Sequence, residues 1–286
     1  GLLLCLGLYG AGICLLRPLP VSGLRITCLD VGQGDGIVVE SPAGAVLVDG
    51  GSTSQSDLGE DCLEPFLESR GIDTIRYALV SHGDQDHISG LLYLLGPDSQ
   101  IQVENLVLPH LGKGRKEYEQ LRILAREKGT RVLYMDEGSR IRLGEMELLC
   151  LYGGDPEGGE ADVNRQSQTV KLSFGPFHML LTGDMDAACE RKLLAQVPEE
   201  ELEGIQLLKT AHHGSKTSSS VEFLEAVKPL AALISYGRDN SYGHPSPEVL
   251  ERFKELGVRV WETGRAGAVT VRIDQGKMEI RGFLPE

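Results

Sequence analysis

From residue 24 onward, apolar positions recur in short runs that are separated by turns rich in glycine, proline and aspartate. Such runs predict strands, whereas longer segments with apolar positions three or four apart predict helices. The expected strands lie at 24–29, 37–40, 45–48, 77–80, 105–108, 131–134, 140–143, 147–151, 168–174, 177–181, 207–210, 231–235, 259–262, 268–273 and 277–281. The expected helices lie at 62–69, 88–95, 116–128, 185–196, 220–227 and 247–256. Two β-rich halves that each contain helices predict an α+β fold, a four-layer αββα sandwich with helices outside two packed sheets.

Residues 2–16 form an uninterrupted apolar run that Arg17 and Pro18 close. The run is slightly shorter than the roughly 20 residues of a full membrane span. No basic segment precedes it, which argues against a complete signal peptide. A buried amphipathic helix is the alternative, but the run has no polar face. We therefore interpret residues 1–23 as the end of a transmembrane helix plus a linker, and residues 24–286 as one domain.

Composition sets limits on the class of protein. The chain has 286 residues, of which 41% are hydrophobic, enough for the core of one large domain or two small ones. Its formal net charge of -14 makes it a poor general binder of nucleic acid, unless cations gather locally or a metal supplies positive charge. The six cysteines are scattered with no Cys-x-x-Cys pair, so we expect buried free thiols rather than a disulfide framework.

Histidine and aspartate gather where expected strands end. The strand at 77–80 leads into His82-Gly83-Asp84-Gln85-Asp86-His87, the strand at 177–181 into Thr182-Gly183-Asp184, and the strand at 207–210 into Ala211-His212-His213-Gly214. A fourth polar loop contains His244, whereas His110 and His178 are interpreted as ordinary histidines. Alone, Thr-Gly-Asp is typical of a turn and His-His-Gly is ambiguous, whereas the motif from His82 to His87 favours a site. Together they indicate ligand chemistry at one edge of the fold.

This pattern predicts a site for two metal ions. In an extended loop alternate side chains point the same way, so His82, Asp84 and Asp86 can converge on one ion. His87 can then turn toward a second ion, and Asp184 can bridge both with its two oxygens. Mixed nitrogen and oxygen ligands suit zinc, and the added carboxylates also suit manganese or iron.

These motifs resemble the metallo-β-lactamase superfamily, whose His-x-His-x-Asp-His motif occurs here with Asp84 in place of the second histidine. Within the superfamily the chain is most similar to the C-terminal domain of DNA-uptake (competence) channel proteins of the ComEC type. The similar stretches are LDVGQGDG (29–36), LVDGG (47–51), SHGDQDHISG (81–90), LLTGD (180–184), LKTAHHGSKTSSS (208–220) and YGHP (242–245). The resemblance implies a metallo-β-lactamase-like hydrolase domain at 24–286, with its metal site at one edge between the two sheets.

The resemblance also implies a ligand set for two zinc or manganese ions. One ion would take His82, Asp84 and Asp184, and the other would take Asp86, His87, Asp184 and His213. His213 is preferred to His212 as the ligand. The superfamily usually has another histidine before the Gly-Asp hairpin, and residues 162–167 contain none, so the first site is expected to be weak or open.

The implied function is that of a metal-dependent phosphodiesterase, a nuclease that hydrolyses DNA with a metal-activated water. The expected partner is single-stranded DNA, with the non-imported strand as substrate, on the extracytoplasmic side of the cell membrane. The expected catalytic residues are Asp86, His212 and His244, and the expected substrate-binding residues are Lys209, Ser215, Lys216 and Tyr242. Two alternatives remain: a hydrolase of another phosphodiester such as cell-wall phosphocholine, and a non-catalytic module that guides DNA through a channel.

Overall fold

The computed structural model describes residues 21–157 and 163–285. Most of the segment expected to end a transmembrane helix, residues 1–23, lies outside the described residues. Within the described ranges, no helix combines the length and the apolar character that crossing a membrane requires.

Two β-sheets form the centre of the fold. The first sheet has the strand order β16-β15-β1-β2-β3-β4-β6-β7, and β5 pairs with β4. Its strands are β1 (Leu24–Cys28), β2 (Ile37–Ser41), β3 (Gly44–Val48), β4 (Thr74–Leu79), β5 (Gln102–Val103), β6 (Asn105–Pro109), β7 (Arg131–Met135), β15 (Val269–Asp274) and β16 (Lys277–Gly282). The second sheet has the order β14-β13-β12-β11-β10-β9-β8. Its strands are β8 (Arg140–Leu143), β9 (Met146–Tyr152), β10 (Thr169–Phe174), β11 (Phe177–Leu181), β12 (Leu207–Lys209), β13 (Ala231–Ile234) and β14 (Arg259–Glu262).

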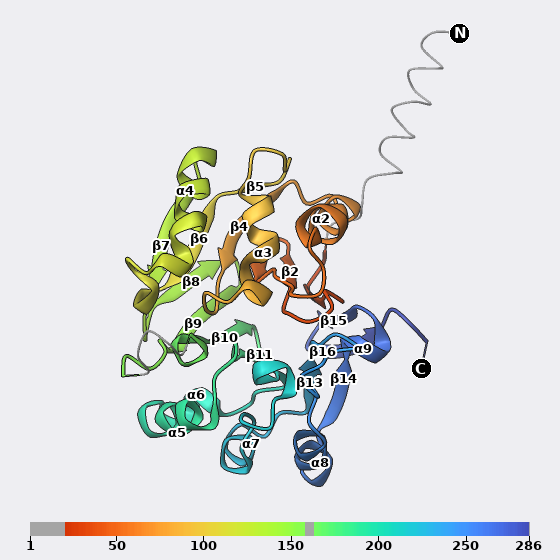
Figure 1. Ribbon diagram of the computed structural model, residues 1–286. Coiled ribbons are helices and arrows are strands. Elements are labelled where there is room, and N and C mark those ends of the chain that lie inside the picture. The colour runs from red at the N-terminus through yellow and green to blue at the C-terminus, as the bar shows by residue number, and fades with distance from the viewer. Residues whose placement is uncertain (1–20, 158–162, 286) are drawn as a thin grey trace, which may run out of the picture.

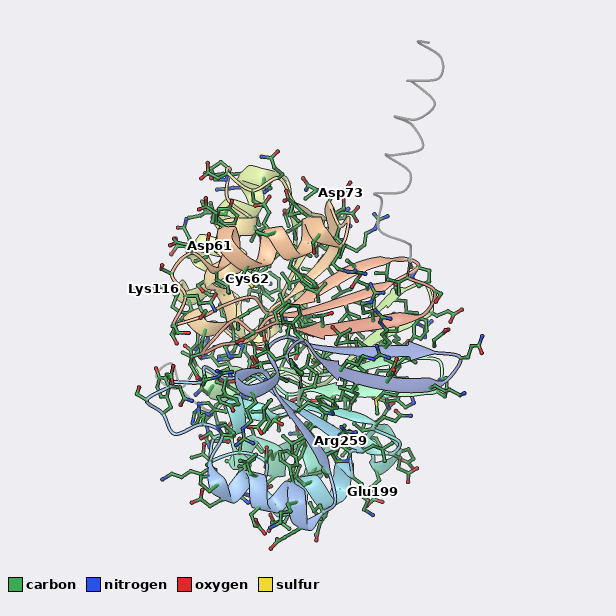
Figure 2. The ribbon with its side chains drawn as sticks, turned by 90° about the vertical axis from the view of Figure 1, so that its right-hand side faces the viewer. Asp61, Cys62, Asp73, Lys116, Glu199 and Arg259 are labelled. Atoms are coloured by element: carbon green, nitrogen blue, oxygen red, sulfur yellow. The ribbon has the colours of Figure 1, made fainter. Side chains whose placement is uncertain are left out.

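Helices cover the outer faces of both sheets (Figure 1). The first sheet carries η1 (Gly59–Leu63), α2 (Glu64–Ser69), α3 (Gln85–Leu94) and α4 (Glu119–Lys128). The second carries α5 (Ala187–Gln196), α6 (Glu199–Leu202), α7 (Val221–Val227) and α8 (Pro247–Glu255), while α9 (Thr263–Ala266) follows β14. In the side view of Figure 2, Asp61 and Cys62 of η1 lie in the upper part, and Glu199 and Arg259 lie in the lower part. The four-layer αββα sandwich expected from the sequence is confirmed.

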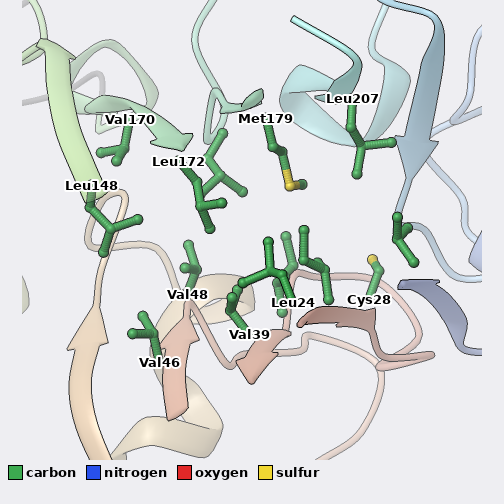
Figure 3. Close-up of a cluster of buried hydrophobic side chains, with 14 of the residues drawn as sticks. Leu24, Cys28, Val39, Val46, Val48, Leu148, Val170, Leu172, Met179 and Leu207 are labelled. Carbon is green, nitrogen blue, oxygen red and sulfur yellow. The ribbon is translucent and has the colours of Figure 1, made fainter. Parts of the chain in front are cut away.

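The main core lies between the two sheets (Figure 3). Val46 and Val48 of β3 face Leu172 of β10 and Met179 of β11, and each of these side chains is at most 3% exposed. Each sheet has a further apolar cluster on its outer face, where its helices pack against it. Strands buried on both faces explain why the sequence shows continuous apolar runs instead of strict alternation.

Parallel pairing brings the functional loops to one edge. β3, β4, β6 and β7 run parallel to one another, and so do β11, β12, β13 and β14. The carboxyl ends of parallel strands lie at the same edge of a sheet, and ligand sites gather there. The expected helix cap at Ser246 is also observed, since its side chain accepts a hydrogen bond from Val249 N–H ahead of Pro247 at the first helical position.

The described cysteines, Cys28, Cys62, Cys150 and Cys189, are all free, as expected. Three of the four are buried, and Cys62 is partly exposed. Burial raises the pKa of the Cys28 thiol to about 12. This thiol therefore stays protonated at neutral pH and behaves as a small apolar side chain.

Candidate metal centre

The segment after β4 changes from extended chain to helix inside the motif. Asp84 is the extended N-cap of α3, with φ -76° and ψ 151°, and the helix begins at Gln85. Asp86 and His87 therefore lie in the first helical turn and not in an extended loop. The extended conformation expected for the whole motif is wrong, because α3 begins at Gln85, so simple alternation of side chains does not reach Asp86.

Asp184 reaches the site through a tight turn after β11. Gly183 has φ +52°, and a Cβ there would lie 2.9 Å from Ser81 Cβ, so a glycine is required by both conformation and space. The backbone N–H of Asp184 donates to Ser167 Oγ at 3.0 Å. The Asp184 carboxylate is 2% exposed, and its Oδ1 has no hydrogen-bond partner.

The two adjacent histidines after β12 lie on η5 (Ala211–Gly214) in a strained conformation. His212 has φ 50° and ψ 45°, and His213 has φ 54° and ψ 22°. Left-handed backbone at a non-glycine residue costs about 1–3 kcal/mol and occurs mainly at functional sites. The consequence is that the two neighbouring rings point in different directions, with an interplanar angle of 75°.

Four side chains meet at the edge between the sheets. One ligand atom from each of Asp86, His87, Asp184 and His213 lies within 4.8 Å of all the others. Asp184 Oδ1 is 3.3 Å from His87 Nε2, and Asp184 Oδ2 is 3.5 Å from His213 Nε2. His213 Nε2 also lies 3.3 Å from Asp86 Oδ2. These are the four residues expected to hold the second ion, and His213, not His212, belongs to the cluster.

The remaining ring nitrogens of both histidines face acceptors. His87 Nδ1 is 3.0 Å from Asp49 Oδ2, and His213 Nδ1 is 3.0 Å from the carbonyl oxygen of Ser235. A carbonyl oxygen can only accept, so Nδ1 of His213 donates to it, and Nε2 is the nitrogen that faces Asp86 and Asp184. A histidine that donates through one nitrogen to a carboxylate or carbonyl is the usual arrangement around a bound metal.

Charges inside the cluster stabilise one another. Burial alone raises the pKa of Asp184, but His213 and His87 beside it bring that pKa well below its usual range. Burial alone lowers the pKa of His87, but Asp184 and Asp49 raise it well above its usual range. Buried groups that shift each other's pKa in this way mark a functional site.

These residues fit a divalent cation. His87 Nε2, His82 Nε2 and Asp184 Oδ1 are buried atoms without a hydrogen-bond partner, although buried polar atoms are normally paired. Two imidazole nitrogens and two carboxylates are a donor set that zinc and manganese accept. Asp86, His87, Asp184 and His213 could therefore hold an ion.

Residues 29–238 match the sequence model of the metallo-beta-lactamase superfamily. The chain belongs to the metallo-β-lactamase superfamily. The resemblance inferred from the sequence motifs is thereby confirmed. A hydrolase fold of this superfamily usually carries a dinuclear metal site, and the His and Asp groups described above lie where such a site can form.

This metallo-β-lactamase domain also has curated relatives, among them one named competence protein ComA. It is 31% identical over 262 residues to ComE operon protein 3 of Bacillus subtilis, covering 87% of this chain and 33% of that protein. It is 28% identical over 270 residues to recombination protein 2 of Haemophilus influenzae, covering 94% of this chain and 31% of that protein. The chain thus spans about a third of the length of these relatives.

Solved structures support the metallo-β-lactamase fold. CmlA, a diiron beta-hydroxylase from Streptomyces venezuelae, has a TM-score of 0.59 at 15% identity, covering 90% of this chain and 55% of that one. YhfI from Bacillus subtilis, a metallo-beta-lactamase fold protein, has a TM-score of 0.54 at 12% identity, covering 84% of this chain and 98% of that one. At these identities the likeness concerns the fold alone.

The residues expected to hold the first ion form a looser group. His82 is fully buried, and its Nε2 lies 3.5 Å from Asp84 Oδ2, while the Asp84 side chain is 42% exposed. Neither residue belongs to the four-ligand cluster. In the segment where the superfamily usually has a further histidine, Asn164 has a buried Oδ1 without a hydrogen-bond partner. The first ion of the expected pair therefore stays a prediction.

Asp35 and Asp49 support the site, and sequence reasoning did not assign them to it. They form a second buried group with His87. However, Asp49 Oδ1 accepts Ser81 N–H at 2.7 Å, and Asp35 Oδ2 pairs with Lys209 Nζ at 2.8 Å. Protein donors occupy these oxygens, so we assign the group to positioning the ligands. The available signal was an Asp-Gly pair in each of two glycine-rich turns, Asp35-Gly36 and Asp49-Gly50.

The structure corrects the expected role of Lys209. The residue is 1% exposed, and its ammonium is held by Asp35 and by the carbonyl oxygen of Thr210 at 3.0 Å. A lysine enclosed in this way does not reach a substrate. The expectation of a substrate contact is wrong for this residue, because β12 points the side chain into the interior between the sheets.

Other expected substrate residues lie around the cluster. The His212 and His244 ring centroids are 5.6 Å apart, and the Tyr242 ring stacks on His244 with centroids 5.7 Å apart. Tyr242 is 63% exposed, and Lys216 is also exposed. Ser215 is nearly buried, and its Oγ lies 2.9 Å from Thr217 Oγ1. Burial, together with nearby His212, lowers the pKa of His244 to about 4, so this ring is neutral at pH 7.

Proposed function

We propose that this domain is a metal-dependent phosphodiesterase that acts on DNA. The observation that carries the proposal is the cluster of Asp86, His87, Asp184 and His213, whose ligand atoms lie within 4.8 Å of one another. The relatives named competence protein ComA of Neisseria gonorrhoeae and recombination protein 2 support DNA as the substrate, since competence and recombination are processes of DNA.

We further propose two divalent ions, zinc or manganese, as the cofactor. Bound ions of this kind lower the pKa of water and neutralise charge on a phosphoryl group. Asp86, His87, Asp184 and His213 would hold one of them, and His82, Asp84 and the bridging Asp184 would hold the other. Asp49 and the carbonyl oxygen of Ser235 keep the Nε2 atoms of His87 and His213 directed at the site.

Neighbouring side chains suit contacts to a phosphodiester. Burial lowers the pKa of His212, which is therefore neutral at pH 7, as is His244. Neutral imidazoles can donate one N–H to a phosphate oxygen. Tyr242 offers an exposed ring on which a base can stack, which contributes about 1–3 kcal/mol per base in single-stranded complexes. Lys216 adds a cation, while nearly buried Ser215 shapes the loop.

We propose that the domain belongs to a longer membrane protein of DNA uptake and lies on the extracytoplasmic side. The support is the apolar run at residues 2–16 and the length of the curated relatives, of which this chain covers 31–35%. In that setting the substrate would be single-stranded DNA, the strand that is not imported.

The test compares the metal-loaded domain with its Asp86→Asn variant. Nuclease assays use single- and double-stranded DNA with Mn²⁺ or Zn²⁺, and bis-p-nitrophenyl phosphate serves as a small phosphodiester. We expect DNA cleavage that requires metal and is lost in Asp86→Asn. A protein that binds metal but cleaves only the small diester would favour another phosphodiester substrate, such as cell-wall phosphocholine. A protein that binds DNA and cleaves nothing would support the non-catalytic guiding module instead.

A further inference from the structure

A short basic segment lies outside the site described so far. Residues 110–116 read His-Leu-Gly-Lys-Gly-Arg-Lys and contain three cations and a histidine, with no carboxylate. The whole chain carries a formal net charge of -14, whereas this segment has an excess of positive charge. We call residues 110–116 the basic loop.

The topology places the basic loop beside the metal centre. β4 and β6 are adjacent and parallel, with Ala78 opposite Leu106. His82 follows β4, and the basic loop follows β6, so both leave the sheet at the same edge. The two segments also approach each other closely: a Cβ built on Gly83, between His82 and Asp84, would lie 2.9 Å from the Cβ of Glu117, the acidic residue that follows the loop.

The shape of the basic loop is held by arginines. Arg115 Nε donates to the carbonyl oxygen of Leu111 at 2.9 Å, and Arg122 of α4 donates through Nη2 to the carbonyl oxygen of Arg115 at 2.9 Å. These bonds order the backbone without using the lysines. The loop is therefore a fixed element on which Lys113 and Lys116 can present their charges.

Both lysines are exposed and carry no ion pair among the described residues. Lys113 Nζ lies 5.9 Å from the centroid of the Tyr134 ring, which positions its charge without neutralising it. Lys116 lies on the left side of the molecule in Figure 2, in the half that contains the first sheet. Free ammonium groups on an ordered loop are suited to phosphates, which lysine binds as a point charge.

We propose that the basic loop binds the sugar-phosphate backbone of a DNA strand next to the nucleotide held at the metal centre. Lys113 and Lys116 supply the phosphate contacts, and His110 is exposed at the start of the same loop. This inference rests on the proposed function. It assigns a strand-binding surface on the first-sheet side of the cluster, whereas Tyr242 and Lys216 come from loops of the second sheet.

The test measures how salt weakens DNA binding. Metal-loaded wild type and Lys113→Gln/Lys116→Gln are titrated with fluorescein-labelled oligothymidylate whose phosphorothioate linkages resist hydrolysis, and anisotropy is read between about 50 and 200 mM salt. Each lost phosphate contact makes the slope of log K against log salt less steep by about 0.7 for a single strand, so two contacts remove about 1.4. At about 0.1 M salt the double variant should bind about 25-fold more weakly.

The matched control is Lys254→Gln/Lys277→Gln, which removes the same charge from α8 and from the start of β16. This control should keep the wild-type slope and affinity, because the effect depends on position and not on net charge. Lys113→Glu/Lys116→Glu should weaken binding beyond the Gln pair, and circular dichroism checks that each variant is folded.

The outcomes separate this inference from the proposed function. Equal slopes for wild type and Lys113→Gln/Lys116→Gln, in a protein that does cleave DNA, would overturn the basic loop alone. An equal loss in the Lys254→Gln/Lys277→Gln control would overturn it as well. A wild type that neither binds nor cleaves DNA would overturn both.

Discussion

The buried ion pair between Asp35 and Lys209 offers the sharpest test of how the site is supported. The two side chains are each 2% exposed, and Asp35 Oδ2 lies 2.8 Å from Lys209 Nζ. Asp35 Oδ1 has no hydrogen-bond partner. We predict that Lys209→Met strongly destabilises the fold, because it leaves the Asp35 carboxylate buried and without its cation.

The magnitude follows from the burial of both charges. Removing one partner of a buried ion pair costs about 3–5 kcal/mol, since the remaining charge keeps its desolvation penalty. For a domain of this size each kcal/mol lowers the melting temperature by about 2–4 °C, so Lys209→Met should melt about 6–20 °C below wild type. In Asp35→Asn/Lys209→Met neither charge remains, and we expect a coupling of about 2–3 kcal/mol between the two sites.

The assay is urea unfolding followed by the fluorescence of Trp261, the single tryptophan, which is 8% exposed in β14. EDTA is present throughout, because metal bound to the folded state would add to its apparent stability. Wild type, both single variants and the double variant complete a cycle. Lys171→Met is the matched control, since Lys171 pairs at 2.8 Å with Glu201, whose side chain is 34% exposed. The Lys171 side chain is 9% exposed, so this pair is more open to solvent than Asp35–Lys209, and we expect it to contribute less to stability.

Two results would refute the reasoning. A loss below about 1 kcal/mol in Lys209→Met would mean that Asp35 does not depend on this cation. Additive losses in the double variant would mean that the two side chains are not coupled, whatever their distance.

Three other predictions concern the same region. Asp49→Asn removes the carboxylate that lies 3.0 Å from His87 Nδ1, and it should lower metal affinity about 10–100-fold. Competition with a chelating dye measures this affinity. An unchanged affinity would contradict the supporting role of Asp49. Gly183→Ala should destabilise the fold more than Gly175→Ala, as measured by differential scanning fluorimetry. Both glycines have positive φ, but only a Cβ at Gly183 would meet a neighbour, at 2.9 Å. Equal losses of stability in the two variants would rule out the close contact as the cause. Burial lowers the pKa of Lys209, but Asp35 raises it, and the net pKa lies above the usual 10.5. Lys209 thus contributes stability that is complete below pH 10.5 and is lost as pH rises through the folded pKa, so urea midpoints of wild type should fall above pH 10.5 more steeply than those of Lys209→Met.

The sequence predicted the architecture well because apolar runs indicate buried strands and glycines indicate the turns between them. It predicted the four-layer sandwich and the Ser246 cap, and it named His213, which lies in the four-residue cluster. The short helices α6 and α9 were not predicted, since four residues give no helical period to read. The start of α3 was placed too late because Gln85, Asp86 and His87 are polar and resemble a loop.

The supporting residues were harder to predict because they depend on pairing across the fold. Lys209 stands beside the histidine motif in the sequence and suggests a phosphate contact, yet β12 turns it inward toward Asp35. These two residues are 174 positions apart, and no local pattern reports such a pair. Exposure of Tyr242 and burial of Ser215 likewise depend on how distant loops pack.

The four cluster residues come in equal numbers from the two halves of the sandwich. Asp86 and His87 belong to the first-sheet half, whereas Asp184 and His213 belong to the second-sheet half. An ion bound by all four would therefore act as a removable cross-link between segments about a hundred residues apart. We expect the two halves to come apart less readily when it is bound, so that resistance to proteolysis reports whether the site holds its ion.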